Sequence, residues 1–330
     1  MPRTCRLALV ALTLALASCG RPHGPEVATS NAAVGQAGAS QATTWIELGT
    51  QSGPIPSGVR SEPAHLLLSD GQAILIDCGD GTSEQLAKAH VKLDDVHTIL
   101  ISHLHFDHTG GLFAFLGMRY QGGGNFAGPV TIYGPPGTRQ MVDTLRQAML
   151  PAAALAPQPP PAYQVIEVND GSRIALGKVT VTAASNSHYA LWQDKGAKPV
   201  SLAYRFDTPG RAIVYTGDTG PSDKVKALAK GADLLVSEIM DADTALATIK
   251  RAHPQIPGVL FGFVKDHFTK EHLLADQVGQ LAAGAGVKAL VLTHFGGAVA
   301  GDTAQIARLT HTIGQTYKGP VTFANDLDRF

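Results

Sequence analysis

Three histidines and one aspartate occur within six residues of this chain, in the order His-x-His-x-Asp-His: His103, His105, Asp107 and His108. An apolar run, residues 96–102, comes before them, and Gly110-Gly111 follows. A strand end followed by a tight loop would bring the first two histidines to one point, and the aspartate and the third histidine to a second point nearby. Imidazole nitrogens bind zinc and similar metals, and a carboxylate helps to hold a second ion. The pattern predicts a metal site, against the alternative of a polar loop with coincidental histidines.

Three further polar residues directly follow apolar runs that read as strands: His188, Asp218 and His294. A single histidine in such a place is more often a satisfied loop or core residue than a ligand. Here three such residues occur at successive strand ends in a chain that also has a strong metal motif. Because the loops at strand ends meet at a cleft, this arrangement favours metal binding instead.

The composition is that of a folded protein, with 44% apolar and 16% charged residues. Its formal net charge of −1 gives no general attraction to polyanions, so non-specific nucleic-acid binding is not favoured. No linker-like break interrupts residues 45–330, and we therefore expect one domain, spanning residues 43–330. A homodimer is left open.

The first 18 residues have the features of an export signal. Arg3 and Arg6 precede the apolar run 7–17, which is too short to span a membrane as a mature helix. The run ends in Leu-Ala-Ser-Cys-Gly, which resembles a bacterial lipobox. We expect cleavage before Cys19 and lipid on its sulfur, which would hold the protein on the periplasmic side of the outer or inner membrane. An ordinary secretory leader with a periplasmic product is the alternative, and residues 19–42 are expected to form a flexible tether.

With Cys5 in the leader and Cys19 lipidated, Cys78 is the one remaining thiol. No internal disulfide can form, and Cys78 is expected to be a small core residue.

Strand-like runs open each half of the domain, and strand–helix alternation closes it. Strands are expected at 64–69, 73–77, 96–102, 130–133, 164–168, 173–184, 200–206, 211–216, 233–237, 289–292 and 321–323. Helices are expected at 83–90, 111–117, 222–230, 241–252, 269–283 and 303–315, with a further helix ending near Leu150 and Thr269 as an N-cap. Residues 151–161 carry five prolines and are expected to form a surface loop. The pattern predicts two mixed sheets packed face to face with helices outside.

Five stretches carry a family resemblance: 76–79, 102–108, 133–138, 215–220 and 292–295. On these stretches the chain resembles the metallo-β-lactamase superfamily, specifically its ribonuclease Z and arylsulfatase-like branch, from about residue 45 to 325. The resemblance implies a four-layer αββα sandwich with two divalent metal ions at one edge, zinc first and manganese or iron as alternatives. It implies that His103, His105 and His188 bind the first ion. It also implies that Asp107, His108 and His294 bind the second, with Asp218 bridging the two.

Two metals ~3.5–4 Å apart can share a hydroxide and lower its pKa from 15.7 to about 7. The resemblance implies that this hydroxide attacks phosphorus or an ester carbonyl, and that Asp107 is a candidate acceptor of its proton. His267 aligns with a family histidine that protonates the leaving group, although Phe268 stands where the family usually has Ser or Thr. Asp77 and Glu238 are candidates for orienting the ligand imidazoles or His267, and buried carboxylates satisfied by backbone amides are the alternative.

The resemblance implies a binuclear hydrolase of phosphodiesters or related small esters. An arylsulfatase or lactonase is the alternative, and a non-catalytic metal-binding lipoprotein is a third reading. Ribonuclease Z itself is disfavoured, because only 29 residues separate His188 from Asp218, where the family inserts its tRNA-clamping arm. Asp218 also argues against β-lactam hydrolysis, since true β-lactamases usually lack the bridging aspartate.

Overall fold

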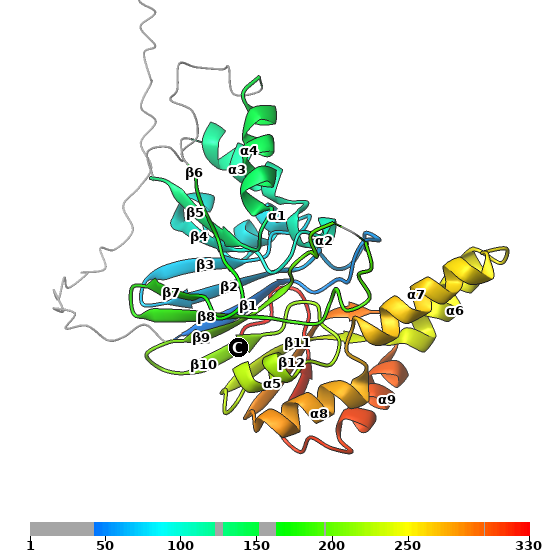
Figure 1. The fold of residues 1–330 in the computed structure, drawn as a ribbon. Coiled ribbons are helices and arrows are strands. Elements are labelled where there is room, and N and C mark those ends of the chain that lie inside the picture. The colour runs from blue at the N-terminus through cyan, green and yellow to red at the C-terminus, as the bar shows by residue number, and fades with distance from the viewer. Residues whose placement is uncertain (1–42, 123–127, 152–162, 195, 300) are drawn as a thin grey trace, which may run out of the picture. The chain divides into compact units, whose positions relative to one another are not determined.

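Two mixed β-sheets lie face to face in this protein, and helices cover their outer faces (Figure 1). A computed structural model describes residues 43–122, 128–151, 163–194, 196–299 and 301–330. The first sheet runs in the order β1 (Thr44–Gly49), β2 (Ala64–Ser69), β3 (Gln72–Ile76), β4 (Val96–Leu100), β5 (Val130–Gly134) and β6 (Tyr163–Glu167). The second runs in the order β13 (Val321–Phe323), β12 (Ala289–Gly296), β11 (Leu234–Met240), β10 (Ala212–Tyr215), β9 (Leu202–Asp207), β8 (Val179–Ser185) and β7 (Arg173–Leu176).

Three apolar clusters separate the four layers. The inner cluster joins the facing sides of the two sheets and includes the fully buried Trp45, Tyr204 and Phe206. One outer cluster packs the first sheet against α1 (Thr82–Lys88), α3 (Leu112–Gln121) and α4 (Thr138–Met149). The other packs the second sheet against α5 (Asp223–Leu228), α8 (Ala275–Ala285) and α9 (Thr303–Ile313). Central strands buried on both faces need apolar side chains all along, which explains their unbroken apolar runs. The predicted single-domain αββα sandwich is confirmed.

A buried carboxylate links the two sheets. Glu47 of β1 accepts hydrogen bonds from Trp45 Nε1 (2.7 Å) and His65 Nδ1 (2.9 Å) on its own sheet. It also accepts one from Thr293 Oγ1 of β12, across the inner layer (2.8 Å). The Glu47 side chain is fully buried, so these three donors replace the water that the charge loses on folding.

Two expected elements differ from the structure. The expected strand 173–184 is a hairpin, β7 and β8, which turns at Gly177 with a left-handed φ of 58°. The expected helix 269–283 begins only at Ala275, and Thr269 lies instead in α7 (Gly258–Lys270). Helix α7 pairs with α6 (Ala242–Ala252) in a hairpin that extends away from the sheets (Figure 1). Because α7 buries no residue and contains two glycines, its sequence lacks the apolar period of a core helix.

Cys78 is confirmed as a buried core residue of the described chain, and burial raises the pKa of its thiol to about 12. The remaining short helices are 3₁₀ turn η1 (Leu93–Asp95) and α2 (Phe106–Thr109). The expected leader, the tether and residues 152–161 of the proline-rich loop lie outside the described residues. Within the described ranges, no helix has the length and apolar character needed to cross a bilayer.

Replacing Glu47 by alanine should destabilise the fold strongly. The substitution leaves three buried donors without an acceptor, each costing about 1–3 kcal/mol. We expect the free energy of unfolding in urea to fall by about 3 kcal/mol or more. Glu47→Gln is the matched control, because its amide oxygen still accepts hydrogen bonds, and it should lose clearly less. Equal losses in the two variants would contradict the linking role of the carboxylate.

Candidate active site

The site lies at the edge where strands of both sheets end. Strands β3 and β4 run parallel in the first sheet, and β10, β11 and β12 run parallel in the second. Their carboxyl ends therefore meet at one edge of the sandwich, the usual place for ligand sites in open α/β sheets. The seven predicted metal ligands come from these ends, from α2 and from the loop after β8.

Three histidines form the first cluster. His105 Nδ1 lies 3.0 Å from His103 Nε2 and 3.1 Å from His188 Nε2. The other ring nitrogen of His188 donates to the backbone carbonyl of Glu271 (3.1 Å), which turns its Nε2 toward the cluster. His103 Nδ1 contacts Ser102 Oγ (3.1 Å), which likewise leaves its Nε2 facing the cluster.

Two histidines and two aspartates form the second cluster. His294 Nε2 lies 3.3 Å from Asp107 Oδ2 and 3.2 Å from Asp218 Oδ2. His108 Nε2 lies 3.6 Å from Asp107 Oδ2 and 3.3 Å from Asp218 Oδ1.

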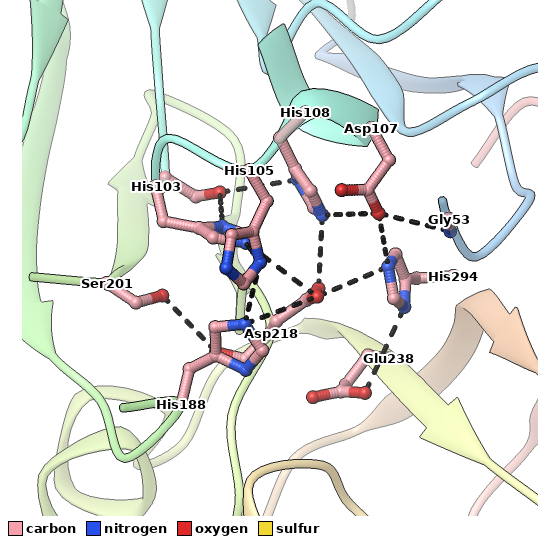
Figure 2. Close-up of polar contacts among 12 residues, drawn as sticks. Gly53, His103, His105, Asp107, His108, His188, Ser201, Asp218, Glu238 and His294 are labelled. Atoms are coloured by element: carbon pink, nitrogen blue, oxygen red, sulfur yellow. Dashed lines mark hydrogen bonds and ion pairs between the residues drawn. The ribbon is translucent and has the colours of Figure 1, made fainter. Parts of the chain in front are cut away.

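Asp218 lies between the two clusters, as Figure 2 shows. One of its oxygens faces His108, while the other lies 3.9 Å from His103 Nε2 and 4.0 Å from His188 Nε2. The structure thus brings all seven predicted ligands together, in the two groups that the sequence predicted, with the aspartate shared between them.

The spacing of these atoms fits metal binding. Nitrogen ligands about 2.0–2.1 Å from a tetrahedral zinc ion lie roughly 3.3 Å apart, close to the observed separations. His108 Nε2 and Asp218 Oδ1 are buried and make no hydrogen bond among the described residues. The two atoms form an ion pair at 3.3 Å without hydrogen-bond geometry, and a cation between them would satisfy both.

The protonation of the histidines differs between the clusters. Burial lowers the pKa of His103 well below its ordinary value and that of His188 to about 3, so both are neutral and able to bind a metal. His108 and His294 are buried too, but the carboxylate of Asp218 and then Asp107 outweigh the burial. Together they raise the pKa of His108 well above its ordinary value and that of His294 to about 9. A metal ion in the second cluster would replace these protons.

Asp77 fixes one ligand from behind. Its Oδ2 accepts hydrogen bonds from His108 Nδ1 (2.8 Å), Ser102 Oγ (2.7 Å) and Tyr215 OH (2.9 Å). This contact directs His108 Nε2 into the second cluster. The other oxygen of Asp77 accepts the backbone N–H of Ser102 (2.7 Å), so both alternatives given for this carboxylate are seen together. The backbone of Asp77 itself has a positive φ of 56°, unusual for a residue with a side chain.

Two glycines allow their own backbone segments to approach Asp107 closely. Gly53 N donates to Asp107 Oδ2 (3.1 Å), and a Cβ at Gly53 would lie 2.2 Å from the Asp107 side chain. A Cβ at Gly79 would lie 2.2 Å from the Asp107 carbonyl oxygen. Any larger residue at either position would displace the aspartate.

Glu238 contacts a histidine that the sequence analysis did not single out. His272 Nδ1 lies 2.6 Å from Glu238 Oε2, and Glu238 Oε1 accepts the amide N–H of Thr219. His272 is buried, and its ring is within reach of both His188 and Asp218. Burial lowers the pKa of His272 to about 3 and raises that of Glu238 well above its ordinary value.

His267 lies one step further from the clusters. Its Nε2 is 3.3 Å from His272 Nε2, and its Nδ1 is 2.8 Å from Glu271 Oε2. Its side chain is 38% exposed, whereas His272 is buried. His272 is therefore a second candidate for the catalytic role expected of His267. Its position five residues after His267 is the feature of the sequence that could have indicated it.

An open cavity of about 600 Å³ adjoins the second cluster. Asp107, His188, Asp218, His267, His272 and His294 line its inner end. A ligand in this cavity could reach both metal clusters and both non-ligand histidines.

Comparison with known proteins agrees with this geometry. Residues 72–295 match the family described as "Beta-lactamase superfamily domain". Ribonuclease Z of Mycobacterium avium (strain 104) is 32% identical over 294 residues, which cover 86% of this chain and 95% of that protein. Ribonuclease Z of Mycobacterium marinum (strain ATCC BAA-535 / M) is 32% identical over 295 residues, covering 86% and 96%.

Solved structures share the fold. The metallo-β-lactamase fold protein YhfI of Bacillus subtilis aligns with a TM-score of 0.64 at 20% identity, covering 87% of this chain and 98% of its own. The short form of human tRNase Z aligns with a TM-score of 0.57 at 23% identity, with the same coverage.

The protonated histidines predict a pH-dependent stability of the metal-free protein. The pKa of His294 is about 9 in the folded chain and about 6.5 in the unfolded chain. A raised folded pKa stabilises the fold below the unfolded value, and this contribution disappears as pH rises through the folded value. After chelation, the free energy of unfolding should therefore fall between pH 7 and 9, by about 2 kcal/mol.

Loading with zinc should remove this dependence, because metal replaces the protons. Elemental analysis should then give about two metal ions per chain, one for each cluster. Asp218→Asn removes the carboxylate that raises both pKa values, so its metal-free form should lose less stability over the same range. A stability that rises from pH 7 to 9 would contradict the assignment.

Proposed function

The chain belongs to the metallo-β-lactamase superfamily and is a metal-dependent hydrolase of the phosphodiesterase type. From this premise, we propose that it holds two divalent metal ions, zinc in the first instance, and hydrolyses phosphodiesters of small molecules. The placement of Asp218 between two separate ligand clusters carries the proposal, because a single metal ion would not need a shared carboxylate.

Two such ions would supply an activated nucleophile and neutralise negative charge on the phosphoryl oxygens. The chain positions them through ligands whose far nitrogens are already bound by Asp77, Ser102 or the Glu271 carbonyl. Asp107 lines the cavity and keeps a depressed pKa despite its burial, because His108 and His294 face it. It is therefore a carboxylate at neutral pH, able to accept a hydrogen bond from the nucleophile and orient it.

The leaving group needs a proton donor on the opposite side. His272 and His267 both line the cavity, and they contact each other through their Nε2 atoms. We assign the donor role to His272, since Glu238 fixes its ring and it lies closer to Asp218 than the partly exposed His267. Burial keeps His272 neutral and raises the pKa of Glu238, so a proton given up at His272 Nε2 would be replaced at Nδ1 from the Glu238 carboxyl group. His267, held by Glu271, would then return a proton to His272 from solvent.

Removal of His272 should separate proton donation from metal binding. The zinc-loaded protein should hydrolyse aryl phosphodiesters, and His272→Ala should keep both metals while kcat falls roughly 10²–10⁴-fold. The loss should be largest for alkoxide leaving groups and smaller for nitrophenolate, which needs little protonation. The measurements are steady-state kinetics over a leaving-group series and elemental analysis of each variant.

His267→Ala is the matched control, because it removes an imidazole of the same cavity that lies further from the metal clusters than His272. Its loss should be smaller and should not depend on the leaving group. The opposite order would assign the donor to His267, as the sequence alone predicted. Aryl sulfates and lactones belong in the same panel, and turnover of either without any phosphodiester turnover would overturn the proposed substrate.

We also propose that the protein is exported and carries lipid on Cys19. The basic start, the apolar run and the Leu-Ala-Ser-Cys-Gly ending support this proposal. Cys19→Ala should move the protein from the membrane to the soluble fraction, or leave the leader uncleaved. Fractionation and intact mass measure both results, and no change in either would mean an ordinary secretory leader.

A further inference from the structure

The outer part of the active-site cavity is apolar. Beyond the metal clusters, the large apolar side chains of its walls are Ile55, Phe106, Ile249, Val264 and Phe268, beside the polar Gln51, Ser52 and Thr248. These side chains come from the loop after β1, from α2 and from both helices of the α6–α7 hairpin. We propose that this wall binds an uncharged aryl or branched alkyl group of the diester, an inference that rests on the proposed function.

The cavity offers no cation to a polyanion. Among its described lining residues there is no lysine or arginine, and the charged groups are the aspartates and histidines of the inner end. None of the four cations of the hairpin lines the cavity: Lys250 lies over the Phe261 ring (5.6 Å), Arg251 donates to Thr248 (3.1 Å), Lys270 pairs with Asp266 (2.9 Å), and Lys265 is exposed on α7. Proteins that bind nucleic acid rely on lysine and arginine contacts to successive phosphates. A single phosphodiester would instead find its positive partners at the metals alone.

Two of the wall residues are exposed to water at a cost. Phe106 is 86% exposed and Ile55 is 72% exposed, although both stand beside a buried polar centre. Large apolar side chains that gather at the mouth of a cavity indicate a ligand that covers them. Phe106 is directly followed by Asp107, so a group packed on its ring would lie next to the metal ligands.

The size of the cavity also suits a small substrate. About 600 Å³ lies in the range of small-molecule pockets, and it would hold the phosphoryl centre together with one or two rings. The phosphoryl group would face Asp218 and His294, while the non-leaving group would lie between Phe106 and the hairpin.

A series of diesters with one leaving group tests this inference on the metal-loaded full chain. Methyl, phenyl and thymidine-5′ p-nitrophenyl phosphates share nitrophenolate, so they differ only in the group that remains on phosphorus. We expect kcat/KM for the phenyl diester to exceed that for the methyl diester by about 10-fold or more. The thymidine diester should not exceed the phenyl diester.

Matched variants locate the effect. Phe106→Ala and Ile55→Lys should reduce the phenyl-to-methyl ratio at least about 5-fold, as expected for the loss of apolar contacts. Phe263→Ala and Val259→Lys are the controls, because these residues are similarly exposed (69% and 75%) on α7 but do not line the cavity. The controls should keep the ratio of the unchanged protein.

Calorimetric titration with diphenyl and dimethyl phosphate separates this inference from the proposed function. Tighter binding of diphenyl phosphate, lost in Phe106→Ala, supports the apolar pocket even if no phosphodiester is hydrolysed. Equal kcat/KM for the phenyl and methyl diesters, or equal binding of the two phosphates, overturns it. Preference for the thymidine diester also overturns it, in favour of a nucleotide site.

Discussion

The carboxylate of Asp218 is the constraint on which the site depends. It is buried among imidazoles, and burial alone would favour its neutral form. Its pKa is nevertheless held well below the ordinary value by His294 and His108, whose own pKa values rise in return. Such a group is tolerated only where positive charge lies on both sides, whether from protons or from metal ions. The folded chain therefore favours cations at this edge before any substrate arrives.

Around this centre, the same pairing recurs in the surrounding layer. Carboxylates contact histidines in four places: Glu47 with His65, Asp77 with His108, Glu238 with His272 and Glu271 with His267. The first joins the sheets, the second orients a ligand, and the last two hold the histidines of the cavity. Each carboxylate fixes one nitrogen of its imidazole, and in the last three pairs the other nitrogen faces the metal clusters or the cavity histidines. The backbone adds to this rigidity, because His294 adopts a left-handed φ of 44° that only its surroundings can maintain.

The sequence predicted the parts of this arrangement that are local. The His-x-His-x-Asp-His spacing places four ligands on one strand end and its loop, and single polar residues after apolar runs indicated the other three. Unbroken apolar runs likewise predicted most of the buried strands, but β1 was not among them. His272 could not be found in this way, because its role depends on a contact with Glu238, 34 residues away and set by the fold. Helix α7 was missed because it projects from the sheets and buries no side chain, so no apolar period marks it.

The metal-ligand residues and the cavity wall determine different properties of the site: the former its chemistry, the latter its choice of substrate. Identity of 32% to ribonuclease Z reflects a shared fold, and the inner end of the cavity carries His and Asp groups that could hold metal ions. Substrate choice depends on what surrounds that chemistry, and here the surroundings are the apolar loop after β1, Phe106 and the α6–α7 hairpin. A long polyanion would have to approach the metals past large apolar side chains, with no lysine or arginine among the described lining residues. The hairpin contacts the sheets little, so Ile249 and Val264 lie away from the ligands, whereas the end of α7 carries His267 and leads into Glu271, which holds His188. A fold built in this way can keep its catalytic centre while the group it accepts beside the scissile bond changes.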